Sequence, residues 1–204
     1  MILSKNKFNE RHDEIMKVAV FLDYANIEAS ARRLGFDVDY GELLNYLADE
    51  TEQRMLQAAY AYVPVDPRLE HARDHDIQNL WDCGYIVRSK IGTIAAESYK
   101  CDFDVEMTLD MVKTAFSLQP DIIVLVSGDS DFVPVVLELR EKGIRVEAAS
   151  FENSMSQLLS NRCSGKISLD FLYQNSLPEE ISDESEFDNE PEFYDVETVS
   201  KGEM

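Results

Sequence analysis

The chain has 204 residues, which is long enough for one domain with a sizeable core and an appendage. Its 40 Asp and Glu residues outnumber 19 Lys and Arg residues, for a formal charge of −21. Such a surface repels phosphate backbones at long range, which counts against a broad nucleic-acid-binding face. It does not exclude a nuclease whose phosphate contacts are made mainly by bound cations.

The cysteines and the hydropathy pattern point to a cytoplasmic protein. Cys83, Cys101 and Cys163 are an odd number without metal-ligand spacing, so we interpret them as reduced thiols. No stretch is apolar for long enough to span a bilayer, and the polar leader at residues 1–16 lacks the pattern of a signal peptide. We therefore expect no membrane association.

In chain order, the first predicted element is a strand at 18–22, a short apolar run that ends at Asp23. Helical spacing follows up to Gly35. Asp39 with Glu42 three residues later resembles a capping box and predicts the start of a second helix. The first crossover is therefore helical.

The next part of the chain repeats this alternation. A loosely alternating segment at 55–63 predicts a strand, and an Asp-Pro pair opens a predicted helix at 66–81 with Gly84 as its stop signal. A third strand is predicted at 85–88. The segment 89–100 has little periodicity and is interpreted as a loop or a short hairpin.

The remaining elements complete an alternating pattern. They are a helix at 103–118, a strand at 122–126, a helix from Ser130 or Asp131 to 142, a strand at 145–149, a short helix at 154–159 and an apolar piece at 167–173. Alternating strands and helices predict an α/β fold with a parallel sheet, right-handed crossovers and helices on both faces. We assign this domain to residues 17–175.

The segment 176–204 is an acidic tail. It carries eleven acidic residues and one basic residue, Lys201, and few apolar side chains. Because such a composition cannot offset the entropy of ordering, we predict a disordered tail. It is a solvated spacer or, through Phe187, Phe193, Tyr194 and Val196, a docking motif for a protein partner.

Four carboxylates converge on one edge of the predicted sheet. Asp23 and Asp129 follow strands, whereas Asp131 and Asp104 begin helices that run antiparallel to the strands. Each alone is explained equally well as a helix cap or a turn residue. Together they need compensation, because two bare carboxylates ~4 Å apart repel by roughly 4 kcal/mol at an effective dielectric of 20.

Hard oxygen ligands without His or Cys select Mg²⁺ or Mn²⁺, and such ions suit phosphoryl transfer because they hold phosphate oxygens and lower the pKa of a bound water. No protein nucleophile is then required. The sequence fits this, because it has no G-x-S-x-G elbow, no Walker glycine loop and no dinucleotide fingerprint.

Three segments resemble the signature blocks of the NYN domain family, in its bacterial LabA-like branch. They are Val20-Phe21-Leu22-Asp23-Tyr24-Ala25-Asn26-Ile27, Lys100-Cys101-Asp102-Phe103-Asp104-Val105-Glu106 and Val126-Ser127-Gly128-Asp129-Ser130-Asp131-Phe132-Val133-Pro134. The resemblance spans about residues 17–160. It implies a Rossmann-like, PIN-type nuclease fold with about five parallel strands in the order 3-2-1-4-5, an acidic metal site and activity on RNA.

The resemblance also implies roles for individual residues. Asp23, Asp104 and Asp129 would be catalytic metal ligands, and Asp131 a further ligand or a supporting acid. Substrate contacts would come from Asn26, Lys100, Ser127 and Ser130, with Asn26 orienting the site or holding a phosphate. Asp110 also matches the family, but six residues along a helix turn it about 240° from Asp104, so a structural role is equally consistent.

The leading hypothesis is therefore a Mg²⁺- or Mn²⁺-dependent endoribonuclease that leaves 5′-phosphate and 3′-hydroxyl ends. The alternative is a regulatory or binding module that keeps the fold without catalysis and acts through RNA or protein partners. A phosphatase or receiver-type pocket fits less well, because Asp23 lacks a second aspartate two residues on. The sequence leaves a homodimer open.

Overall fold

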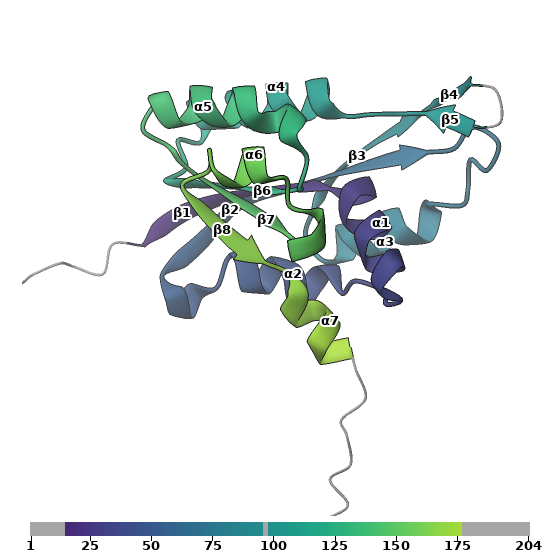
Figure 1. Cartoon of the computed structure of the whole chain (residues 1–204), viewed down its shortest axis with the longest axis horizontal. Coiled ribbons are helices and arrows are strands. Elements are labelled where there is room, and N and C mark those ends of the chain that lie inside the picture. Colours follow the sequence, from purple (N-terminus) through teal and green to yellow (C-terminus); the bar gives the residue numbers. More distant parts are fainter. Residues whose placement is uncertain (1–14, 96–97, 177–204) are drawn as a thin grey trace, which may run out of the picture.

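A six-stranded parallel sheet forms the centre of the computed structural model, which describes residues 15–95 and 98–176 (Figure 1). The strand order is β3-β2-β1-β6-β7-β8. These strands are β1 (Met16–Asp23), β2 (Arg54–Val65), β3 (Ile86–Ile91), β6 (Ile122–Val126), β7 (Arg145–Ser150) and β8 (Gly165–Ser168). A separate antiparallel hairpin follows β3 and consists of β4 (Thr93–Ala95) and β5 (Ser98–Lys100). The predicted leader and acidic tail lie almost entirely outside the described residues.

Helices cover both faces of this sheet and make three layers (Figure 1). One face packs against α1 (Tyr24–Leu34), α2 (Tyr40–Leu47), α3 (Asp74–Asp82) and α7 (Asp170–Ser176), and the other packs against α4 (Asp104–Ser117), α5 (Val133–Glu141) and α6 (Gln157–Ser160). Three short 3-10 helices are η1 (Glu50–Glu52), η2 (Ser130–Phe132) and η3 (Glu152–Ser154). Within the described ranges, no helix combines the length and apolar character needed to cross a bilayer.

The central strands are apolar without interruption because both faces are covered. In β6, Ile122, Val124 and Val126 pack into the core beneath α1 and α2, while Ile123 and Leu125 pack into the core beneath α4 and α5. All five residues are 0 % exposed. The polar chemistry of this strand is therefore confined to its carboxyl end.

The α/β architecture predicted from the sequence is confirmed, with one strand added. The order 3-2-1-4-5 is present, and β8 lies beyond β7 as a sixth strand at the edge. The sequence analysis missed β8 because only alternate residues of its Gly-Lys-Ile-Ser segment are shielded, so no apolar run marks it. The segment 89–100 completes β3 and then forms a short hairpin, one of the two predicted outcomes.

One helix begins later than predicted. The segment expected to be helical from residue 66 is helical only from Asp74. The Asp66 carboxylate instead accepts hydrogen bonds from the backbone N–H of Arg68 at 2.9 Å and from its guanidinium at 2.5 Å, which closes a turn. By contrast, the predicted stops Gly35 and Gly143 are confirmed with φ of +82° and +85°.

A buried ion pair ties the two halves of the sheet together. Glu147 in β7 is 2 % exposed and accepts hydrogen bonds from the Arg54 guanidinium of β2 at 3.1 and 2.9 Å. Arg54 also donates to the carbonyl of Leu47 at the end of α2, and Arg145 contacts Glu147 at 2.7 Å. A charge this deeply buried depends on its partners.

Replacing Arg54 with alanine should therefore destabilise the protein by about 3 kcal/mol, the lower end of the range for a broken buried pair, because Arg145 still compensates Glu147. Urea unfolding measures this cost. The matched control is Lys142→Ala, which removes an ion pair with Glu138. The Lys142 and Glu138 side chains are 51 % and 54 % exposed. This control should cost less than about 0.5 kcal/mol, and equal costs for the two variants would contradict the role of burial.

Candidate functional site

The predicted site lies where β1 and β6 end side by side. The strands pair in parallel with Leu22 opposite Val126, so Asp23 and Ser127 leave the sheet at the same level. The Asp23 carboxylate accepts a hydrogen bond from the Ser127 hydroxyl at 3.0 Å and caps α1 by accepting one from the Asn26 backbone N–H at 3.2 Å. One carboxylate thus joins two strand ends and a helix start.

The loop after β6 is held by its own side chains and by α1. Ser127 Oγ accepts from the backbone N–H of Asp129 at 3.2 Å, and Asp129 Oδ1 accepts from the N–H of Asp131 at 3.0 Å, which caps η2. Across the strands, the Asn26 side-chain oxygen accepts from the Gly128 N–H at 3.1 Å. These bonds fix where the Asp129 carboxylate stands.

Gly128 is required at this position by a close backbone approach. A Cβ there would lie 2.0 Å from the carbonyl oxygen of Ser154, a backbone atom that cannot rotate away. The Gly128 carbonyl in turn accepts from the Ser156 N–H at 2.9 Å, and the Ser154 hydroxyl is 2.7 Å from that of Ser30 in α1. The loop is therefore clamped between α1 and the segment that follows β7.

The electrostatics of this edge are uncompensated. Burial, opposed by the hydrogen bonds from Asn26 and Ser127, raises the pKa of Asp23 from 3.8 to about 6, and the nearby charges of Asp104 and Asp129 add to the rise. Burial also raises the pKa of Asp104, with contributions from Asp129, Asp102 and Asp131. The main causes of these two raised pKa values are burial and neighbouring carboxylates, and no cationic side chain of the described residues is among those main causes. Mutual repulsion of carboxylates is the pattern that precedes cation binding.

The carboxylates at this edge match in part the divalent cation that the family resemblance implies. They fit in chemistry, because Asp23, Asp104 and Asp129 are hard oxygen donors, and the charges of Asp104 and Asp129 raise the pKa of Asp23. They do not form a ready-made cage: among residues 15–95 and 98–176, no three His, Cys, Asp or Glu side chains are grouped closely enough to hold a metal ion. Charge and donor type therefore support the cation, whereas the side-chain arrangement provides no assembled three-ligand site.

The other predicted site residues take different positions. Ser127 is 0 % exposed, and its hydroxyl donates a hydrogen bond that positions Asp23. Its contact with substrate stays a prediction. Asn26 orients the loop, one of its two predicted roles. Asp131 and Lys100 are exposed, Ser130 is half-buried, and Lys100 lies in β5.

Asp110 contacts residues of β2, β3 and α4. Its side chain accepts a hydrogen bond from the Tyr62 hydroxyl at 3.1 Å and pairs with Arg88 at 3.4 Å and Lys113 at 3.6 Å. It therefore has the structural role that the helical spacing left open, linking α4 to β2 and β3.

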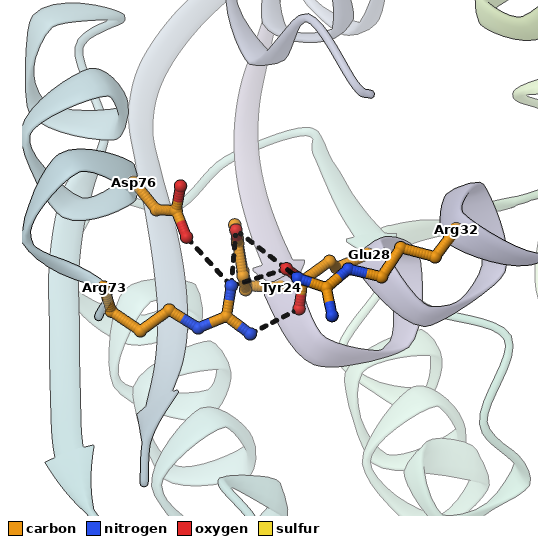
Figure 2. A network of polar contacts seen from close by, with 5 residues as sticks. All are labelled: Tyr24, Glu28, Arg32, Arg73 and Asp76. Atoms are coloured by element: carbon orange, nitrogen blue, oxygen red, sulfur yellow. Dashed lines mark hydrogen bonds and ion pairs between the residues drawn. The ribbon is translucent and has the colours of Figure 1, made fainter. Parts of the chain in front are cut away.

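A second polar cluster, which the sequence analysis did not predict, links α1 to the start of α3 (Figure 2). The Arg73 guanidinium bonds both carboxylate oxygens of Glu28, at 2.5 and 2.6 Å, and Asp76 at 2.9 Å, and it lies 5.2 Å from the centre of the Tyr24 ring. Arg32 also reaches Glu28, at 2.7 Å. Because its charges are paired, this cluster stabilises the helix that presents Asp23 and leaves no excess charge for a ligand. No short sequence motif marks it, since Glu28 and Arg73 are distant in the chain.

Comparison with known proteins agrees with the family resemblance of the three sequence blocks. A model of the NYN domain family matches residues 17–170. The low amplitude and bright protein LabA of Synechococcus elongatus is 28 % identical over 174 residues, which are 80 % of this chain and 91 % of that protein. A crystal structure of a protein of unknown function from Vibrio parahaemolyticus has a TM-score of 0.65 at 25 % identity, covering 78 % of this chain and 96 % of that one.

The raised pKa of Asp23 predicts an unusual pH dependence of stability. A carboxyl group with a folded-state pKa of about 6 against 3.8 contributes most to stability below about pH 4, and that contribution is lost as the pH rises through 6. In a chelating buffer, Asp23→Asn should therefore raise the free energy of unfolding by about 1–3 kcal/mol at pH 7.5 and change it little at pH 4. Urea unfolding at both pH values measures this.

The matched control is Asp37→Asn, at an exposed position, which should leave stability unchanged at both pH values. A loss of stability in Asp23→Asn that grows with pH would contradict the assignment of Asp23 as a destabilised carboxylate.

Proposed function

Because this chain belongs to the NYN domain family, part of the PIN-like nuclease superfamily whose members are generally nucleases, we propose that it is a Mg²⁺- or Mn²⁺-dependent endoribonuclease. The proposed reaction is hydrolysis of an RNA phosphodiester bond by water at the carboxylate edge of β1 and β6. The choice of RNA rests on the family resemblance of the three sequence blocks.

The observation that carries this proposal is the position of Asp23. It is a half-buried carboxylate that faces the charges of Asp104 and Asp129, and burial has raised its pKa to about 6. A protein gains nothing in stability from such an arrangement in the absence of a ligand. Sites of this kind are typical of function, because the ligand supplies the missing charge.

In this proposal Asp23, Asp104 and Asp129 hold the cation, which would bind phosphate oxygens and favour deprotonation of water. The remaining residues position these acids. Ser127 holds Asp23 and the Asp129 backbone through one hydroxyl group, and Asn26 holds the loop through Gly128. Asp131 is exposed beside them and adds negative charge that raises the pKa of Asp104.

A second candidate is a module that binds RNA or protein without cutting RNA. The observation in its favour is that the described part of the chain holds no three-carboxylate group ready to receive a metal ion. The overall charge of −21 also disfavours broad phosphate contact. Cleavage assays separate the two candidates.

Asp129→Asn should abolish cleavage of single-stranded RNA in Mn²⁺, reducing the rate at least 100-fold, because a metal ligand loses its charge while an asparagine can still cap η2. Gel analysis of end-labelled RNA measures the rate and the termini of the products. Asp37→Asn, exposed and beyond the opposite end of α1 from Asp23, is the control and should cut at the wild-type rate. Unchanged cleavage by Asp129→Asn would contradict the site.

Millimolar Mn²⁺ should raise the melting temperature of the wild-type protein, because a ligand that binds only the folded state stabilises it. The rise should be several degrees and should shrink by more than half in Asp129→Asn. Differential scanning fluorimetry with Mn²⁺ and with a chelator measures it. Equal rises in both proteins would show that the cation binds elsewhere, for example at the acidic tail.

A further inference from the structure

A basic groove lies between the edge strand β3 and helix α4. Its volume is about 640 Å³. The charged side chains that line it include Arg88 and Lys90 of β3 and Lys113 of α4, and its apolar lining includes Val87, Phe103 and Leu109. β3 is the last strand of the sheet on this side, as far as residues 15–95 and 98–176 show.

The groove begins beside the carboxylate edge. Asp23 of β1 pairs with Tyr62 of β2, and Tyr62 pairs with Arg88 of β3, so the three residues form one row across the sheet. Phe103 packs edge-on against Tyr62, with ring centres 5.5 Å apart, and directly precedes Asp104. A chain lying in the groove would therefore continue past Phe103 to the proposed site of hydrolysis.

The charge of the groove is opposite to that of the protein as a whole. Three cations face two acids: Lys90 contacts Glu106 at 2.5 Å, and Arg88 and Lys113 contact Asp110 at 3.4 and 3.6 Å. The Arg88 and Lys113 side chains are 53 % and 72 % exposed. Their shared partner Asp110 is only 16 % exposed, but it also accepts a hydrogen bond from the Tyr62 hydroxyl. Partly exposed pairs of this length contribute little to stability, so a phosphate can take over these cations at small cost.

We propose that this groove binds the segment of single-stranded RNA that flanks the scissile phosphate. Arg88, Lys113 and Lys90 contact the phosphates, and unpaired bases lie against Phe103 and Leu109. The combination of cations and apolar side chains favours a single strand, whose bases are free to stack, over a duplex, whose bases are hidden. This inference rests on the proposed function, because it identifies where the RNA substrate of that reaction binds.

The test is binding of a short fluorescein-labelled oligouridine, followed by fluorescence anisotropy in a chelating buffer where no cleavage is expected. The double variant Arg88→Gln/Lys113→Gln should bind at least fivefold more weakly, and the slope of log affinity against log salt should fall by about 1.4, or 0.7 for each lost phosphate contact. Lys142→Gln/Lys166→Gln is the control, since it removes the same charge from exposed positions outside the groove and should bind within twofold of wild type.

Lys113→Glu is the second variant, because this side chain is 72 % exposed and its reversal of charge leaves the Arg88–Asp110 and Tyr62–Asp110 contacts in place. It should weaken binding at least threefold with an unchanged melting temperature. The proposal is overturned if both double variants weaken binding equally, if a duplex of the same length binds as tightly as the single strand, or if wild type binds no RNA.

The failure of this proposal is distinct from failure of the nuclease. Groove-dependent binding without Mn²⁺-dependent cleavage supports the groove and rejects the enzyme. Cleavage lost in Asp129→Asn but unaffected in the groove variants supports the enzyme and rejects the groove.

Discussion

The hydrogen bonds that join the ends of β1 and β6 are the constraint on which the rest of the site depends. Asn26 accepts from the Gly128 N–H, and Ser127 donates to Asp23, so each strand end holds the other. Gly128 makes this possible because its missing side chain lets the loop lie directly against the Ser154 carbonyl. Hydrogen bonds from the Ser127 hydroxyl and from backbone N–H groups therefore hold Asp23 and Asp129 in place, which leaves their negative charge available.

Two charged clusters lie at α1, and they differ in whether their buried charges are paired. Between α1 and the start of α3, Arg73 is paired with Glu28 and Asp76, and this cluster stabilises the fold (Figure 2). At its amino end, the raised pKa of Asp23 reflects burial beside Asp104 and Asp129. The charges around Arg73 neutralise one another, whereas ionised Asp23 lowers the stability of the fold. A functional ligand is the simplest physical reason for such a destabilising carboxylate.

The topology separates the charges along the carboxylate edge. β1 and β6, at the centre, lead into acids, while β3, the edge strand in the described part of the chain, carries Arg88 and Lys90. A chain with a formal charge of −21 thus keeps a small cationic surface next to its acidic site. Such local placement would let an acidic protein bind the proposed polyanionic substrate, because short-range contacts are less screened than the long-range field.

The sequence by itself determined the α/β class, the helix stops at Gly35 and Gly143 and the meeting of Asp23 with the loop after β6, because these follow from apolar runs, glycine conformation and right-handed crossovers. The central strand order was expected only from the family resemblance of the three sequence blocks. Only the tertiary structure decided the edge strand β8, the late start of α3 at Asp74, the burial of Ser127 and the partners of Asp110. These depend on contacts between residues far apart in the chain, such as Arg73 with Glu28 or Asp110 with Tyr62, and local patterns carry no record of such contacts.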